Sequence, residues 1–402
     1  MDYDPQQPQG SVSEVFRVFL KLGLTSFGGP IAHLGYFRDE VVTRRKWLSE
    51  SAYADLVALC QFLPGPASSQ VGFALGLTRA GWGGALAAFV AFTLPSAMIL
   101  LALALTAGHI ESPIGLGVLH GLKIVAVAVV AQAVWSMGRT LCPDWPRITL
   151  MLLCAGLILM LPSVWTPPVL MLLAGLAGAL AFRAAPGHAG ETLPVRIDRR
   201  QGAAWLALFM LLLFGLPVLD AAVGNVRLAQ IDAFYRSGSL VFGGGHVVLP
   251  LLQSAVVEPG WVEQEAFLAG YALAQAVPGP LFTFAAFLGA SMQVGASGWG
   301  GAALCLVALF LPSFLLVAGT LPFWAGLRRQ APARGALAGV NAAVVGLLLA
   351  ALCDPLWTSA IFSPADACLA LVAFLALQFL RAPSWLVVLA GALAGWAIHA
   401  PL

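Results

Sequence analysis

Long apolar segments follow one another along almost the whole chain, with short polar stretches between them. In the first half they cover residues 13–44, 51–78, 84–107, 117–137, 148–162 and 168–183. One segment at 202–223 follows, and a second series covers 229–253, 266–290, 298–321, 335–352, 366–380 and 384–398. About 20 apolar residues suffice for a helix to cross a bilayer. The pattern therefore predicts an all-α polytopic membrane protein with about 13 membrane segments.

The second series repeats the first. The stretch "QFLPGP" at 61–66 matches "QAVPGP" at 275–280, and "GWGGALAAFVAFTLPS" at 81–96 matches "GWGGAALCLVALFLPS" at 298–313. Near the start of each series, "FLKLGLTSFGG" matches "FYRSGSLVFGG". Such ordered matches at a nearly constant offset indicate internal duplication. The predicted organisation is an N-terminal repeat at 1–190, a basic linker with a connecting helix at 191–228, and a C-terminal repeat at 229–402.

Composition supports a membrane environment. Only 9% of the residues are charged and 60% are apolar, with a mean hydropathy of +0.90. A soluble domain carries about 25% charged residues, so this chain has too few to cover its surface in water. The net charge of +2 and the absence of a Lys/Arg-rich run argue against a nucleic-acid partner.

Loop charges predict that the two repeats are inverted. Lys and Arg in short loops stay in the cytoplasm. The loop at 38–46 carries four basic residues, whereas its counterpart at 253–265 carries three glutamates and no base. The next two pairs of loops also have opposite bias. These charges place the N-terminus in the cytoplasm and the C-terminus outside, as in transporters built from inverted repeats.

Two segments in each repeat contain residues that break helices. Gly28-Gly29-Pro30 and Pro64-Gly65-Pro66 both fall near mid-segment. Proline removes a backbone donor, and glycine accepts the backbone angles of a tight turn. Because two full crossings would move the basic loop outside, we favour helical hairpins that enter the bilayer and return. Kinked full crossings are the alternative.

The breaks predict an anion site. Non-helical backbone at membrane depth is tolerated where protein buries it or where it lines a wet cavity, and a new helix N-terminus attracts anions. Inverted repeats would bring the four breaks together near the midplane. The candidate substrate-binding residues are Lys21, Ser26, Gly28, Gly29, Gln61, Gly65, Ser68, Ser69, Arg236, Gly243, Gly244, His246, Gln275, Gly279 and Thr283.

Two further features are each open to two interpretations. Lys21 and Arg236 each lie six residues before a Phe-Gly-Gly, where a charge in an apolar segment suggests function, although both side chains can also snorkel toward headgroups. Asp55 and His33 are candidates for proton coupling, and structural roles are the alternative. The small-residue runs at 173–178 and 389–395 indicate close helix packing.

The six cysteines have no paired spacing and lie mostly in apolar runs. They are interpreted as small core residues, so no disulfide framework, metal site or cofactor is expected. Together with the absence of a histidine-rich motif, this also disfavours an intramembrane enzyme.

The two Phe-Gly-Gly elements, the block from Gly28 to Gln70 and the paired GWGGA…LPS blocks together resemble the chromate ion transporter family, in its two-domain, ChrA-type form. The matching positions in the first half are Phe27, Gly28, Gly29, Pro30, His33, Gly35, Arg38, Trp47, Gln61, Pro64, Gly65 and Pro66. Those in the second half are Phe242, Gly243, Gly244, Gln275, Pro278, Gly279 and Pro280. The second copy lacks the basic run and is degenerate.

The resemblance implies a secondary active transporter in a bacterial inner membrane. It implies export of chromate driven by the proton-motive force, which confers chromate resistance. Sulfate, a tetrahedral dianion of the same shape, is the related substrate and expected competitor. Uptake or exchange of sulfate or a related oxyanion, or a channel, is the alternative function. Oligomeric state is left open, with a homodimer as one arrangement.

Overall fold

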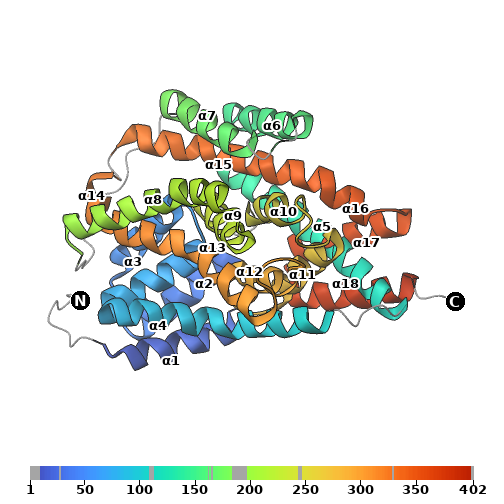
Figure 1. The fold of residues 1–402 in the computed structure, drawn as a ribbon, viewed down its shortest axis with the longest axis horizontal. Coiled ribbons are helices and arrows are strands. Elements are labelled where there is room, and N and C mark those ends of the chain that lie inside the picture. The colour runs from blue at the N-terminus through green and yellow to red at the C-terminus, as the bar shows by residue number, and fades with distance from the viewer. Residues whose placement is uncertain are drawn as a thin grey trace.

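The computed structural model describes residues 10–26, 29–107, 113–161, 163, 166–182, 197–242, 247–327 and 330–399. These residues are almost entirely helical and include no strand (Figure 1). The first half contains α1 (Val12–Thr25), α2 (Gly29–Arg38), the π-helix η1 (Asp39–Arg44), α3 (Glu50–Phe62), α4 (Ala67–Ala107), α5 (Pro113–Leu141), α6 (Trp145–Met160) and α7 (Thr166–Ala181).

Helix α8 (Arg199–Val223) connects the two halves. The second half contains α9 (Val226–Leu240), α10 (Val248–Val256), α11 (Gln264–Ala276), the 3-10 turn η3 (Leu281–Thr283), α12 (Phe284–Ala290), α13 (Gly298–Thr320) and η4 (Leu321–Phe323). It ends with α14 (Trp324–Leu327), α15 (Ala331–Ala351), the π-helix η5 (Leu352–Trp357), α16 (Thr358–Ala360), α17 (Pro364–Gln378) and α18 (Ser384–His399).

Length and composition agree with a multi-pass membrane protein. In the part of the chain that the structure describes, five helices are long and apolar enough to cross a membrane: those within 67–106, 117–141, 199–223, 298–323 and 331–360. Five shorter apolar helices cover 145–160, 166–181, 281–290, 364–378 and 384–397. Four of the six cysteines are buried, as expected for small core residues, whereas Cys353 and Cys368 are exposed.

The predicted helix breaks are confirmed. Helix α1 ends at Thr25 and α2 begins at Gly29, whereas α3 ends at Phe62 and α4 begins only at Ala67. The second half is interrupted at the equivalent places, between α9 and α10 and between α11 and η3. A further bend occurs inside α4, where Gly81 has a positive φ of 64°. This bend separates the second and third apolar segments of the sequence.

Equivalent helices of the two halves make equivalent contacts. Helix α1 packs on α4, and α9 packs on α13. A Cβ atom at Gly23 of α1 would lie 2.7 Å from the Phe92 carbonyl oxygen, and one at Gly238 of α9 would overlap the Leu309 carbonyl oxygen. The backbones approach this closely only because these positions are glycine. The repeated sequence thus specifies repeated packing.

The later helices of each half pack on helices of the opposite half, and we call this arrangement exchanged packing. Helix α5 packs on α17 and α18, whereas α15 packs on α6 and α7. A Cβ at Gly121 of α5 would overlap the Gly391 carbonyl oxygen of α18, and one at Gly339 of α15 would overlap the Ala174 carbonyl oxygen of α7. The close packing expected of the small-residue runs is confirmed, and each run contacts the opposite half.

Helix α4, after its bend, and its equivalent α13 run in opposite directions along the molecule (Figure 1). Helix α13 leads to α14 at the left of that view, and α4 leads away from it. Helix α8 lies on the outside and exposes Leu211, Phe214 and Val218. An exposed apolar helix of this length suits a lipid environment.

Candidate functional site

Two backbone hydrogen bonds connect the breaks of one half with those of the other. The N–H of Gly65, in the first Pro-Gly-Pro, donates to the carbonyl of Val241 at 2.6 Å. The N–H of Gly279, in the second Pro-Gly-Pro, donates to the carbonyl of Ser26 at 2.9 Å. Val241 and Ser26 each directly precede a Phe-Gly-Gly. We call the region around these two bonds the crossing.

Both central glycines are required by geometry. Gly65 has φ of 122° and Gly279 has φ of 104°, angles that side chains rarely adopt. A Cβ at Gly65 would overlap the Oγ of Ser313, and one at Gly279 would lie 2.8 Å from the Oγ of Ser96. These serines close the two matching LPS stretches. Each LPS serine therefore lies against the glycine of the opposite half.

His33 links the two breaks through side-chain contacts. Its Nε2 lies 3.2 Å from the Ser26 carbonyl oxygen, which also accepts from Gly279. Its Nδ1 lies 3.4 Å from the Oγ of Ser68, in the first turn of α4. The ring is buried and packs edge-on against Phe92. A continuous chain of polar contacts thus connects the second Pro-Gly-Pro with the helix that follows the first.

Several buried polar atoms at the crossing find no hydrogen-bond partner within the described part of the chain. They are the hydroxyls of Ser26, Ser69, Thr93 and Ser313 and the Oε1 of Gln70. A buried polar group without a partner costs about 1–3 kcal/mol, and such groups in native proteins call for an explanation. Hydroxyl groups and the free N–H groups of a helix N-terminus suit a ligand that accepts hydrogen bonds. This arrangement can bind an anion.

The second break offers fewer free groups. Thr283, equivalent to Ser69, donates its hydroxyl to the Pro280 carbonyl at 2.7 Å. Only a 3-10 turn and the seven-residue α12 follow. Gln275 hydrogen-bonds to Tyr271. The first break, which is followed by the long helix α4, therefore provides more of the donors.

The structure does not bring every candidate residue to the crossing. Gln61 is exposed on α3, and Asp55 is half-buried on the same helix. Gly29 begins α2 with φ of 80°. Arg236 forms an ion pair with Asp232 of its own helix. The candidates Gly28, Gly243, Gly244 and His246 lie outside the described residues.

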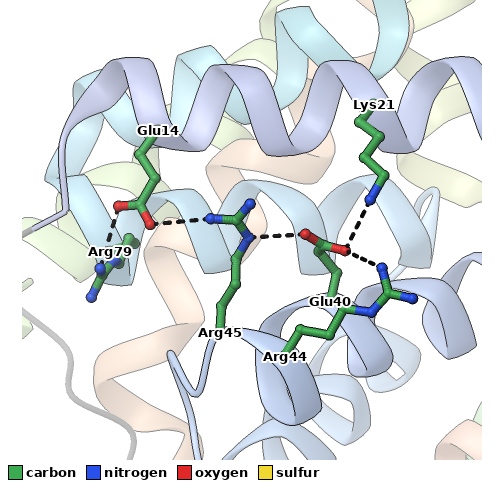
Figure 2. A network of polar contacts seen from close by, with 6 residues as sticks. All are labelled: Glu14, Lys21, Glu40, Arg44, Arg45 and Arg79. Atoms are coloured by element: carbon green, nitrogen blue, oxygen red, sulfur yellow. Dashed lines mark hydrogen bonds and ion pairs between the residues drawn. The ribbon is translucent and has the colours of Figure 1, made fainter.

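Lys21 belongs to a polar network at the basic loop (Figure 2). Its Nζ lies 3.5 Å from Glu40, which also contacts Arg44 and Arg45. Burial alone would raise the pKa of the Glu40 carboxyl, but the hydrogen bond from Arg45 and the charge of Lys21 outweigh it. The pKa of Glu40 is therefore lowered.

The same network reaches the bend of α4. Glu14 of α1 contacts Arg45 at 3.5 Å and Arg79 at 3.3 Å (Figure 2). Arg79 also lies over the Trp47 ring. The network joins α1, the basic loop and the residue just before the bend. It pairs Arg44 and Arg45, two of the four basic residues of this loop, with carboxylates of the network.

Ser96, Ser313 and Thr93 are the residues that sequence reasoning missed. The LPS stretches were visible as repeats, but a serine after a proline in an apolar helix carries no chemical signal of its own. Their recurrence at matching positions was the available signal. Their contact with the opposite half depends on tertiary packing, which the motif does not predict.

Comparison with known proteins agrees with this architecture. The sequence model of one family, described as "Chromate transporter", matches residues 13–179 and again residues 228–396. A "Chromate transport protein" of Pseudomonas aeruginosa is 30% identical over 406 aligned residues, covering 97% of this chain and 93% of that protein.

Two further relatives come from other organisms. A "Probable chromate transport protein" of Synechococcus elongatus is 28% identical, covering 86% of this chain and 84% of its own. An uncharacterized transporter of Methanocaldococcus jannaschii is also 28% identical, covering 85% and 83%. No solved structure matches this chain. Because the family model covers most of the chain in two copies, the protein belongs to the chromate transporter family.

Proposed function

We propose that this protein exports chromate, a tetrahedral oxyanion, across the plasma membrane of a bacterium and thereby confers chromate resistance. The single observation that carries the proposal is the crossing. It combines buried hydroxyls that have no partner among the described residues with two backbone hydrogen bonds between the halves. The names of the relatives supply the identity of the anion, and membership in a family of transporters argues against an enzyme.

The crossing suits a substrate that binds and leaves. Its available donors are hydroxyls and the backbone N–H groups at the start of α4, whereas Lys21 and Arg236 pair with Glu40 and Asp232. Among the candidate residues of the sequence, we propose that Ser26, Gly65, Ser68, Ser69 and Gly279 form the site. His33 is the preferred proton-coupling residue because it contacts both breaks.

The proton-motive force favours export. Moving one elementary charge through 100 mV corresponds to about 2.3 kcal/mol. A dianion that leaves a cell with a negative interior therefore gains about 4.6 kcal/mol per 100 mV. Coupling to proton entry would add to this. Sulfate, with the same charge and shape, is expected to compete at the same site.

We further propose inverted topology, with about 13 membrane segments, the N-terminus in the cytoplasm and the C-terminus outside. The opposite directions of α4 and α13 (Figure 1) and the exchanged packing of α5 and α15 support the inversion. The division at 1–190, 191–228 and 229–402 follows the same scheme, and the breaks belong to hairpins that enter the bilayer and return.

Inverted membrane vesicles test the transport activity. Energised vesicles with an acidic, positive interior are expected to accumulate chromate, with an uncoupler abolishing accumulation and sulfate competing with it. Vesicles from cells without the protein are the control. Accumulation in right-side-out vesicles alone would indicate uptake, the alternative function. Absence of accumulation in both kinds of vesicle would refute the proposal.

Cysteine labelling tests the inverted topology. Replacing the exposed Cys353 and Cys368 with alanine leaves four buried cysteines as background. In that protein, Glu263→Cys is expected to react with an impermeant maleimide in intact cells, and Arg44→Cys only after the cells are opened. Both side chains are exposed, so both should be reactive once reached. Labelling of both positions from one side would contradict the inversion.

A further inference from the structure

The strongest unexplained feature is the meeting of Ser313, Gln70 and Gly65. A Cβ atom at Gly65 would overlap the Oγ of Ser313 and would lie 2.8 Å from the Nε2 of Gln70. Both residues are fully buried. The Gln70 Nε2 donates to the Pro64 carbonyl at 2.7 Å, whereas its Oε1 and the Ser313 hydroxyl lack partners in the described chain.

The equivalent serine of the first half is in a different state. Ser96 donates its hydroxyl to the Thr93 carbonyl of its own helix at 3.0 Å. The two serines occupy matching positions, and each lies against the glycine of the opposite half. They differ because the Ser96 hydroxyl donates a hydrogen bond within its own helix, whereas the Ser313 hydroxyl has no partner among the described residues. Among the described residues, the hydroxyl without a partner is the one beside the first break, where α4 begins and where Ser69 likewise has none.

We propose that Ser313 is a direct ligand of the transported oxyanion. The serine of the second repeat donates its hydroxyl to an anion held at the N-terminus of α4, together with Ser69. This inference rests on the proposed function and deepens it. The site binds a tetrahedral dianion through uncharged donors, and it is complete only when both repeats contribute. Ser96 occupies the equivalent position in the first half but contributes less to anion binding, because its hydroxyl already donates to the Thr93 carbonyl.

The chemistry explains why a buried hydroxyl is left without a partner. A hydroxyl already bound to a carbonyl must give up that bond to reach an anion, whereas a free one does not. Hydrogen bonds to charged groups are also stronger than neutral ones. The cost of the free group in the empty protein is recovered when the oxyanion binds.

The test compares Ser313→Ala with Ser96→Ala in the full-length protein. Chromate and sulfate are titrated separately against purified protein, with thermal unfolding followed in the absence and presence of each anion. Ser313→Ala is expected to weaken binding of chromate about tenfold or more, and Ser96→Ala is expected to weaken it less. If only one of the two anions responds to Ser313→Ala, that anion is the one the site is built for.

The empty protein provides the readout that separates binding from structure. Removing an unpartnered buried hydroxyl should leave the midpoint temperature of unfolding unchanged or raised, while the increase caused by chromate is lost. Ser237→Ala is the matched control, because that buried hydroxyl donates to the Ala233 carbonyl of its own helix. It is expected to bind chromate normally.

Two results would overturn the assignment. One is normal anion binding by Ser313→Ala when the unaltered protein also binds. The other is a Ser313→Ala protein that is destabilised when empty but keeps its full response to chromate, which would make Ser313 structural. Failure of the unaltered protein to bind either anion would instead refute the proposed function, and this inference with it.

Discussion

Replacing Gly65 with alanine is expected to abolish chromate transport. Two effects combine at this position. The backbone has φ of 122°, a conformation that costs a side chain about 1–3 kcal/mol, and the new Cβ would overlap the Oγ of Ser313. The Ser313 side chain, the break or α13 must therefore move, and each of these movements changes the crossing. Transport in energised inverted vesicles should fall at least tenfold.

Variants of two other glycines distinguish the effect of backbone strain from that of overlap with a serine side chain. Gly81, at the bend of α4, also has positive φ but nothing within 4 Å of its would-be Cβ. Gly81→Ala should therefore report backbone strain alone and keep most transport. Gly279→Ala should be intermediate, because its Cβ would lie 2.8 Å from Ser96 Oγ. The amount of monodisperse protein in the membrane must be measured for each variant. Equal transport by Gly65→Ala and the unaltered protein would contradict the crossing as the site.

The sequence predicted the helices well because their signals are local. Apolar segments, Pro-Gly-Pro stretches and glycine pairs each act within a few residues, and the helix breaks fall where those residues lie. The duplication was visible for the same reason. Membership in the family followed from motifs that span nearly the whole chain.

The partners of these elements could not be predicted, because they depend on how the halves pack. Lys21 appeared to be a substrate ligand as a lone charge in an apolar segment, but Glu40, nineteen residues later, pairs with it in the structure. Nothing in the local sequence marks Ser313, which lies against Gly65 of the other half. Neither contact has a signature in the local sequence.

A leucine in place of Gly121 is expected to separate the exchanged helices and prevent assembly of the transporter. Even a Cβ at this position would overlap the Gly391 carbonyl oxygen, and the nearby Cα of Gly395 would lie 3.0 Å away. Backbone atoms cannot rotate aside as a side chain can, so α5 must move away from α18. Overpacking costs about 1–3 kcal/mol where side chains yield, and more is expected here.

Gly138 provides the control on the same helix, because nothing lies within 4 Å of its would-be Cβ. Gly138→Leu adds the same volume to α5 and should leave yield and transport unchanged. Gly339→Leu, at the equivalent position of α15, should reproduce the defect of Gly121→Leu, because its Cβ would overlap the Ala174 carbonyl oxygen. Size-exclusion profiles and vesicle transport of the three variants measure this. If Gly121→Leu and Gly339→Leu are defective but Gly138→Leu is not, the packing of α5 on α18 and of α15 on α7 holds the two repeats together. Equal behaviour of all three variants would contradict this role of the two helix contacts.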